Sequence, residues 1–195
     1  MPTHYFDPAP RVASAPRTVE LVLADLTVSL KTDRGVFSTD RIDPGTKLLL
    51  QEAPPPTNGG DLLDLGCGYG PVAVALALRA PAARIWAVDV NQRALELVAT
   101  NAAAHSLTNI TTAHPHAVSP AVAFTACYSN PPIRVGKATL HSILDRWVPR
   151  CAVTYLVVSK HLGSDSLAAW MGAERGWTVD RLISRVGYRI LSVKP

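Results

Sequence analysis

From residue 60 onward, the chain alternates between short apolar stretches and longer segments with apolar residues at helical spacing. Strands separated by helices in this way lie mostly parallel in one sheet, and the helices cover both of its faces. The sequence therefore predicts an α/β fold. We expect strands at 61–65, 84–89, 110–113, 124–129, 152–159, 177–184 and 187–193, and helices at 71–80, 92–105, 137–148 and 165–175.

The carboxyl ends of the strands are where a sheet of this kind binds its ligands. In this chain that rule points to four segments that follow expected strands. Functional residues are therefore expected at 66–70, 89–91, 113–116 and 130–133.

The first 57 residues have a different pattern and are expected to form a small cap on a main domain of residues 58–195. Residues 1–16 hold four of the sixteen prolines and are interpreted as an irregular arm. Apolar and polar residues then alternate over 18–32, which predicts a β-hairpin. Asp43 followed by Pro44 predicts the start of a short helix, which ends before three consecutive prolines that begin at Pro54.

The composition excludes several classes of protein. Hydrophobic residues make up 48% and charged residues 17% of the chain, which is typical of a globular domain rather than a disordered or fibrous one. No apolar run is long enough to cross a bilayer and the first residues do not resemble a secretory signal, so we expect a cytoplasmic protein without a membrane partner. The three cysteines are an odd number without Cys-x-x-Cys spacing, which favours buried thiols over disulfides or a zinc site.

The formal net charge of +4 is distributed unevenly. Residues 1–100 carry nine Lys or Arg against eleven Asp or Glu, and residues 101–195 carry ten against four, which gives −2 and +6. A basic half suits a polyanionic partner such as RNA, although many proteins with similar charge bind no nucleic acid.

Three glycines, at positions 66, 68 and 70, follow the first expected strand of the main domain, and Asp64 precedes them. Glycine lets the backbone turn sharply and lets a ligand lie against it. The spacing differs from the Gly-x-Gly-x-x-Gly of dinucleotide-binding proteins and suits a nucleoside with a charged amino-acid tail better than a pyrophosphate. A plain tight turn is the alternative interpretation.

Asp89 ends the next expected strand. A carboxylate at that position can accept hydrogen bonds from both hydroxyl groups of a ribose. The alternative role, capping the helix that follows, is one that Asn91 fills equally well. We therefore interpret Asp89 as a ribose ligand.

The segment Asn130-Pro-Pro-Ile133 follows the fourth expected strand. Its two prolines hold the chain extended and have no N–H, which leaves the Asn130 side chain and the Pro131 carbonyl as acceptors for an exocyclic amine. An amine that donates both hydrogens there would aim its lone pair outward, ready for attack on an electrophilic methyl group about 3 Å away. A rigid turn without a ligand is the alternative.

These segments together resemble the small-domain methyltransferases, class I enzymes that use S-adenosylmethionine and include the ribosomal RNA guanine-N2 methyltransferases. The resemblance rests on Asp64-Leu-Gly-Cys-Gly-Tyr-Gly70, on Val88-Asp-Val-Asn91, and on Ser129-Asn-Pro-Pro-Ile133 followed by Arg134 and Lys137. Weaker similarities lie in the cap, at His4-Tyr-Phe6, Gly35-Val-Phe-Ser38 and Asp43-x-Gly-Thr46, and near the end, at Gly187-Tyr-Arg189. The resemblance covers nearly the whole chain.

The resemblance implies a Rossmann-like sheet of seven strands with the last one antiparallel, and N-methylation of an exocyclic amine, most simply N2 of a guanine in ribosomal RNA. It implies action on ribosomal RNA or a ribosomal subunit. A monomer is favoured, although the sequence does not set the oligomeric state. The residues that would orient the target are Asn130, Pro131, Pro132 and Ile133, and those that would contact RNA phosphates are Arg134, Lys137, Arg146 and Arg150. The residues that would bind the cofactor are Phe37, Thr46, Asp64, Gly66, Cys67, Gly68, Tyr69, Gly70, Asp89, Val90, Asn91, His116 and Asn130.

Two positions that are usually acidic in the family hold His116 and Thr125, and the second, degenerate domain copy of many family members is not seen here. His116 and Thr125 suggest cofactor binding without turnover as one alternative. Methylation of a glutamine amide on a protein is another, because a site of the Asn-Pro-Pro-aromatic type also serves that reaction. His114 and His116 lack a third ligand, so no metal site is expected.

Overall fold

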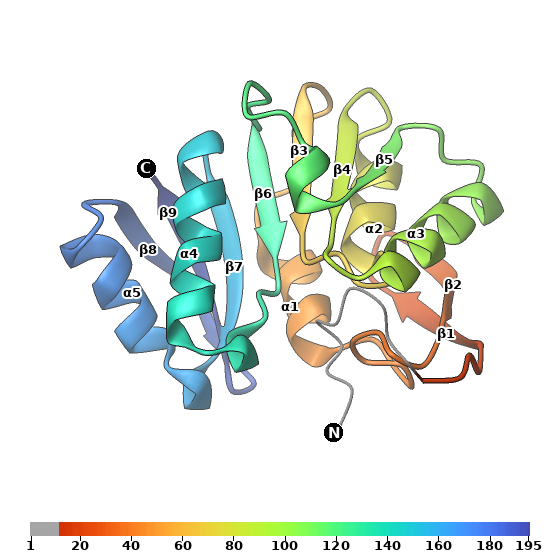
Figure 1. Cartoon of the computed structure of the whole chain (residues 1–195), viewed down its shortest axis with the longest axis horizontal. Coiled ribbons are helices and arrows are strands. Elements are labelled where there is room, and N and C mark those ends of the chain that lie inside the picture. Colours follow the sequence, from red (N-terminus) through yellow and green to blue (C-terminus); the bar gives the residue numbers. More distant parts are fainter. Residues whose placement is uncertain (1–11) are drawn as a thin grey trace.

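The computed structural model describes residues 12–195, without the side chain of Arg134. Its centre is a seven-stranded sheet (Figure 1) with the strand order β5, β4, β3, β6, β7, β9, β8. Neighbouring strands from β5 to β7 are parallel, whereas β9 is antiparallel to β7 and to β8. The expected mainly parallel sheet with an antiparallel last strand is confirmed. The strands are β3 (Asp61–Leu65), β4 (Arg84–Val88), β5 (Ile110–Ala113), β6 (Ala126–Ser129), β7 (Thr154–Ser159), β8 (Thr178–Arg185) and β9 (Tyr188–Lys194).

Helices cover both faces of the sheet. α1 (Pro44–Glu52), α2 (Pro71–Arg79) and α3 (Gln92–Ala104) share one apolar cluster with one face. α4 (Lys137–Trp147) and α5 (Ser164–Ala173) pack against the other face, and both lie in front of the sheet in Figure 1. The chain order reverses between β3 and β6, and such a reversal is where ligands bind in open α/β sheets.

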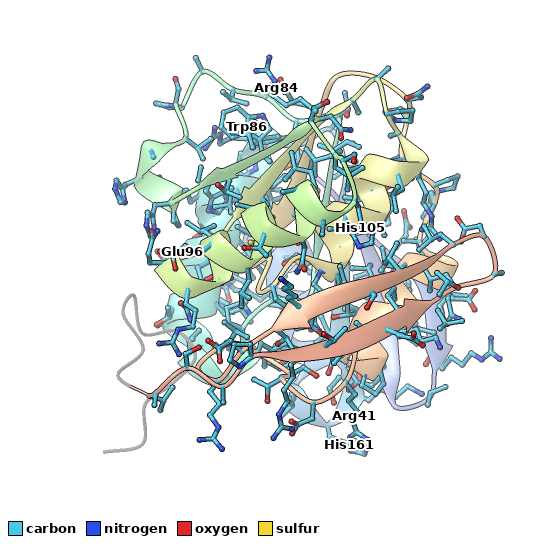
Figure 2. All side chains as sticks on the ribbon, turned by 90° about the vertical axis from the view of Figure 1, so that its right-hand side faces the viewer. Arg41, Arg84, Trp86, Glu96, His105 and His161 are labelled. Atoms are coloured by element: carbon cyan, nitrogen blue, oxygen red, sulfur yellow. The ribbon has the colours of Figure 1, made fainter. Side chains whose placement is uncertain are left out.

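The expected hairpin and short helix of the cap are both present. β1 (Arg17–Val22) pairs antiparallel with β2 (Thr27–Thr32), and the Asp43 side chain accepts a hydrogen bond from the Thr46 N–H at the start of α1. Figure 2 shows the hairpin beside α3, where the His105 ring nitrogen lies 2.8 Å from the Ser29 carbonyl oxygen. The cap contributes to the same apolar cluster as α2 and α3, so it is packed as part of the main core. The boundary at residue 57 remains a proposal.

One expected strand is shorter than its pattern. β6 begins at Ala126, and Phe124 makes only an isolated bridge with Cys151. Thr125 still contacts the neighbouring strand, because its N–H and its hydroxyl both donate to the carbonyl of Asp61, the first residue of β3. Short 3-10 turns, η1 to η4, follow β5, β6, α4 and β7 at Pro115–Ala117, Ile133–Val135, Val148–Arg150 and Lys160–Leu162.

The three cysteines are buried free thiols, as expected. Within residues 12–195 no helix is both long and apolar enough to cross a membrane. The same residues bring together no group of three or more potential metal ligands from His, Cys, Asp and Glu.

Replacing Thr32 with valine should stabilise the protein. Thr32 is fully buried in β2, and its hydroxyl has no hydrogen-bond partner. Valine has the same shape without the buried polar atom, so we expect a gain of about 1 kcal/mol in the free energy of unfolding. Urea denaturation should show a higher midpoint with an unchanged slope. A lower midpoint would mean that the hydroxyl is satisfied in solution.

Candidate active site

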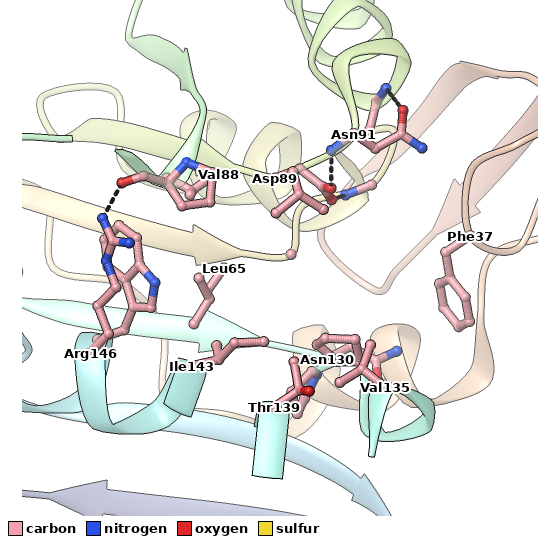
Figure 3. Close-up of a pocket in the computed structure, with 18 of the residues that line it drawn as sticks. Phe37, Leu65, Val88, Asp89, Asn91, Asn130, Val135, Thr139, Ile143 and Arg146 are labelled. Carbon is pink, nitrogen blue, oxygen red and sulfur yellow. Dashed lines mark hydrogen bonds between the residues drawn. The ribbon is translucent and has the colours of Figure 1, made fainter. Parts of the chain in front are cut away.

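A cavity of about 400 Å³ opens at the carboxyl ends of β3, β4 and β6. Figure 3 shows Leu65, Val88 and Asp89 on one side of it, and Asn130, Thr139 and Ile143 on the other. A smaller cavity of about 30 Å³ lies next to it, between the glycine loop and α1. The sequence pointed to this edge of the sheet, and the structure brings residues of all four expected segments around one hollow.

The glycines of the loop after β3 have two different roles. Gly66 and Gly68 line the main cavity with positive φ angles of 76° and 54°, and a Cβ at either position would meet no atom within 4 Å. They therefore form an open floor on which a ligand can lie. Gly70 does not fit the expected cofactor role, because it caps α2 and faces Val98, which a Cβ would meet at 3.0 Å. Its small size serves the packing of α2 on α3.

Asp89 is held at the edge of the cavity by two backbone groups. Its carboxylate accepts hydrogen bonds from the Gly68 N–H at 2.9 Å and from the Asn91 N–H at 2.9 Å. Asn91 caps α3 through the N–H groups of Arg93 and Ala94, so the capping role considered for Asp89 is already filled. Burial raises the pKa of Asp89 above its ordinary value, against the effect of these hydrogen bonds. The carboxylate thus ties the glycine loop to β4 and faces the hollow.

Asp64 lies beneath the glycine loop and is almost fully buried. Its side chain accepts a hydrogen bond from the Ala73 N–H in the first turn of α2 at 2.8 Å. Burial, with a smaller contribution from the nearby Asp89, raises the pKa of Asp64 to about 8 despite this bond. A cationic group in the small cavity, which Asp64 lines, would favour the charged form of this carboxyl.

Asn130 lines both cavities and is anchored by α1. Its amide nitrogen donates to the Asp43 carboxylate at 2.8 Å and to the Thr46 hydroxyl at 3.0 Å. Because both acceptors lie on the nitrogen side, the amide oxygen of Asn130 is the atom left to accept from a ligand.

The Pro131 carbonyl is less free than expected. It accepts a hydrogen bond from the Ile133 N–H at 2.8 Å, and Pro132 between them has φ −73° and ψ 75°, the geometry of an inverse γ-turn. One lone pair of the carbonyl oxygen is therefore used by the turn. Asn130 becomes the main acceptor of the segment.

Ile133 is not where the base contact was expected. Ile133 and Val135 both pack against the apolar cluster formed by α4, α5 and the sheet. Only Val135 of these two lines the cavity, together with Pro131 and Pro132. The γ-turn and the following 3-10 turn, Ile133–Val135, rotate the chain so that Val135 replaces Ile133 at the wall.

The candidate RNA-binding arginines differ in their surroundings. Arg150 does not fit the expected contact with an RNA phosphate. Its guanidinium donates to the carbonyls of Ser119 and Val122 and lies 4.7 Å over the Trp147 ring. It braces the loop before β6 and is not free for a phosphate. Arg146 donates to the Pro115 carbonyl at 2.6 Å and lines the cavity (Figure 3). Lys137 is exposed at the start of α4, and the side chain of Arg134 lies outside the described part of the structure.

His116 does not reach the cavity as expected. It is exposed, its ring stacks on His114 at 5.5 Å, and Pro115 between them lines the hollow. The 3-10 turn Pro115–Ala117 thus places Pro115 at the cavity and leaves His116 outside it.

Most of the other expected cofactor residues line one of the two cavities. Phe37 lines both, Val90 and Asn91 line the larger, and Thr46, Cys67 and Tyr69 line the smaller. Burial raises the pKa of the Cys67 thiol well above its ordinary value, as suits an inert loop residue. The motif at His4-Tyr-Phe6 and the arm before residue 12 lie outside the described residues.

The sequence interpretation missed one wall of the cavity, which α4 provides. The residues of this wall recur at helical spacing, and the sequence had indicated only Arg146 among them, as a phosphate contact. They are Thr139, Ser142, Ile143, Arg146 and Trp147. Val36 was also missed, and it lies beside Phe37 in the loop after the hairpin.

Comparisons with known proteins agree with this geometry. A family model described as methyltransferase small domain matches residues 27–162. The uncharacterized protein YbxB of Bacillus subtilis is 33% identical over 172 residues, which are 85% of this chain and 86% of that protein. Ribosomal RNA small subunit methyltransferase C of Shewanella baltica is 35% identical over 146 residues, or 71% of this chain. The match covers 42% of that enzyme, so the chain spans less than half of its length.

Solved structures share the fold. A 16S rRNA N2 methyltransferase of T. thermophilus, solved with AdoMet and guanosine, superposes with a TM-score of 0.76 over 95% of this chain and 52% of that chain. The two sequences are 23% identical, so this likeness concerns the fold.

Proposed function

Because the chain belongs to the methyltransferase small domain family, we propose that it transfers the methyl group of S-adenosylmethionine to N2 of a guanine in ribosomal RNA. The single observation that carries the proposal is the place of Asn130, whose amide oxygen is left free to accept from an amine at the wall of the cavity that also holds the glycine loop and Asp89. Relatives that act on small-subunit ribosomal RNA support the choice of substrate.

The described residues fit S-adenosylmethionine, which supplies an electrophilic methyl group when bound. The open floor at Gly66 and Gly68 accepts a flat ligand against the backbone, and the Asp89 carboxylate suits the two ribose hydroxyls. Asp64 lines the small cavity, where its charge suits the ammonium of the amino-acid tail. Apolar side chains on the walls suit the adenine ring, among them Val88, Pro115 and Ile143.

Asn130 would orient the target amine by accepting one of its hydrogens, and the second lone pair of the Pro131 carbonyl would accept the other. Both bonds keep the nitrogen lone pair out of conjugation with the ring and direct it at the methyl group. Val135 and Pro132 would pack against the base, a contact that we assign to Val135 in place of Ile133. Catalysis then comes from positioning in a site that excludes water, and the amine loses its proton to solvent after the transfer.

The basic second half of the chain supports an RNA substrate over a glutamine on a protein. Arg146 lines the cavity and Lys137 is exposed at the start of the same helix, α4. These two are the described candidates for phosphate contacts, with Arg134 as a third from the sequence. A ribosomal substrate goes with a cytoplasmic location, and we expect the protein to act as a monomer.

The direct test is methylation of ribosomal RNA by the purified protein, followed by mass spectrometry of the nucleosides. We expect N2-methylguanosine to form with S-adenosylmethionine and to be missing from the RNA of cells that lack the gene. Methylation of a protein glutamine instead would establish that alternative. Cofactor binding with no methyl transfer to either substrate would establish a non-catalytic protein.

Charge reversal at Lys137 should weaken RNA binding and reduce its salt dependence. The Lys137→Glu variant loses one phosphate contact. A plot of log affinity against log salt concentration should therefore be less steep by about one unit of slope. Fluorescence anisotropy with labelled ribosomal RNA at several salt concentrations measures the slope. Lys194→Glu is the matched control. Lys194 is exposed at the end of β9, which lies beside the start of β7 and therefore at the opposite end of the strands from the cavity. Equal slopes in both variants would remove Lys137 from the RNA interface.

A further inference from the structure

The first turn of α1 and the Asn130 side chain form one hydrogen-bonded group. The Asp43 carboxylate oxygen Oδ2 accepts from the Thr46 N–H at 3.0 Å and from the Asn130 amide at 2.8 Å. The Thr46 hydroxyl accepts from the same amide nitrogen at 3.0 Å, and Thr46 is 6% exposed. Asn130 is 84 or more positions away from Asp43 and Thr46 in the chain, so only the fold brings it to them.

Two acceptors on the nitrogen determine which way the amide of Asn130 points. A flipped amide would place its oxygen against the Asp43 carboxylate, and two acceptors without a proton between them repel each other. The Asn130 oxygen is therefore directed away from α1. A carboxylate bonded to the NH₂ group also polarises the amide, which makes its oxygen a stronger acceptor.

The first turn of α1 is itself held in place by β9. A Cβ at Gly45 would lie 2.8 Å from Cε1 of Tyr188 and 2.9 Å from the Asp43 carboxylate oxygen, so the Tyr188 ring packs directly on this turn. Gly45 is buried in this contact. Asp43 and Thr46 are thus supported by the Tyr188 ring, which packs on the first turn of α1.

We propose that Asp43 and Thr46 are positioning residues that fix the Asn130 amide with its oxygen toward the target amine. This inference rests on the proposed function, because it concerns how the same site orients its substrate. It also changes the role expected for Thr46, from cofactor contact to support of Asn130. The cap that carries α1 then takes part in catalysis rather than only covering the domain.

The test compares Thr46→Val with Thr46→Ser. Valine keeps the shape but removes the acceptor, so kcat for RNA methylation should fall about tenfold while the dissociation constant for S-adenosylmethionine stays within about twofold. Serine retains the hydroxyl and should recover most of the lost kcat. Thr32→Val is the matched control, because it makes the same change in the cap at a hydroxyl that has no partner. It should leave kcat unchanged.

A double-mutant cycle separates positioning from general damage. In an Asn130→Ala background, Thr46→Val should cost no further activity, because the group that it positions is already gone. Full additivity of the two losses would overturn the proposal, and so would a weaker binding of S-adenosylmethionine with unchanged kcat, which would make Thr46 a cofactor contact. Asp43→Ser, which can still cap α1 but is too short to reach Asn130, should show the same kcat loss with little change in stability.

A second readout does not depend on the substrate. The side-chain amide protons of Asn130, followed by NMR, should exchange with solvent slowly in the wild type and Thr32→Val and clearly faster in Thr46→Val. Equal exchange in all three would overturn the positioning role whatever the enzyme methylates. If the wild type exchanges slowly but methylates no ribosomal RNA, the proposed substrate is wrong and the positioning of Asn130 stands.

Discussion

Replacing Asn130 with alanine should lower kcat by about a hundredfold or more, which corresponds to about 2.7 kcal/mol of transition-state stabilisation. The amide oxygen is the main acceptor of the Asn-Pro-Pro segment, because the Pro131 carbonyl is partly used by the γ-turn. Its bond to the amine strengthens as the nitrogen gains positive charge in the transition state. Steady-state methylation kinetics measure kcat, and calorimetry should find the affinity for S-adenosylmethionine nearly unchanged.

Asn58→Ala is the matched control for this variant. Asn58 is exposed in the loop before β3, at the opposite end of the sheet, where its side chain accepts a hydrogen bond from the Ala82 N–H. Asn130→Asp should not restore activity, because a carboxylate there would face the carboxylate of Asp43 within hydrogen-bonding distance. If the Asn130→Ala protein methylates RNA at the wild-type rate, the Asn-Pro-Pro segment serves only as a turn. The target amine must then be held elsewhere.

Replacing Asp89 with alanine should weaken the binding of S-adenosylmethionine about thirtyfold, or by about 2 kcal/mol. Two charge-assisted hydrogen bonds to the ribose would be lost. The Gly68 N–H and the Asn91 N–H would also lose their acceptor, so the glycine loop would be less well held. Isothermal titration calorimetry on the folded variant measures the affinity.

Asp180→Ala provides the control for Asp89. Asp180 is exposed on β8, at the far edge of the sheet, and its loss removes the same charge without approaching the cavity. Its affinity for S-adenosylmethionine should equal that of the wild type. If Asp89→Ala also bound with wild-type affinity, the ribose could not lie at this strand end and the assignment of the cavity would be wrong.

The alternation of strands and helices was enough to predict the fold class. Each segment between Asp61 and Lys194 has the periodicity of the element that it forms, and the ends differ by a few residues. The glycine loop, Asp89 and Asn130 were also found from the sequence, because each directly follows a strand and parallel strands end at one edge. Local patterns could therefore place these groups around a common hollow.

Tertiary contacts decided the details that local patterns do not contain. Because of the γ-turn at Pro132, Val135 and not Ile133 lies at the wall of the cavity. Because of the turn after β5, His116 lies outside the cavity. The guanidinium of Arg150, a candidate for phosphate binding, instead donates to carbonyls about thirty residues earlier in the chain. No local sequence pattern predicts this pairing. Each of these outcomes depends on backbone geometry or on a distant partner.

Periodicity and strand ends are local properties, so they were enough to predict the order of the elements, the end of the sheet where the cavity lies and the residue types that gather there. The tertiary structure alone decided which atoms of those residues are free to act. Asn130 presents its oxygen because Asp43 and Thr46, far away in the chain, accept from its nitrogen. Hydrogen bonds between distant segments form only when the chain has folded, so the direction of the key amide is a property of the fold.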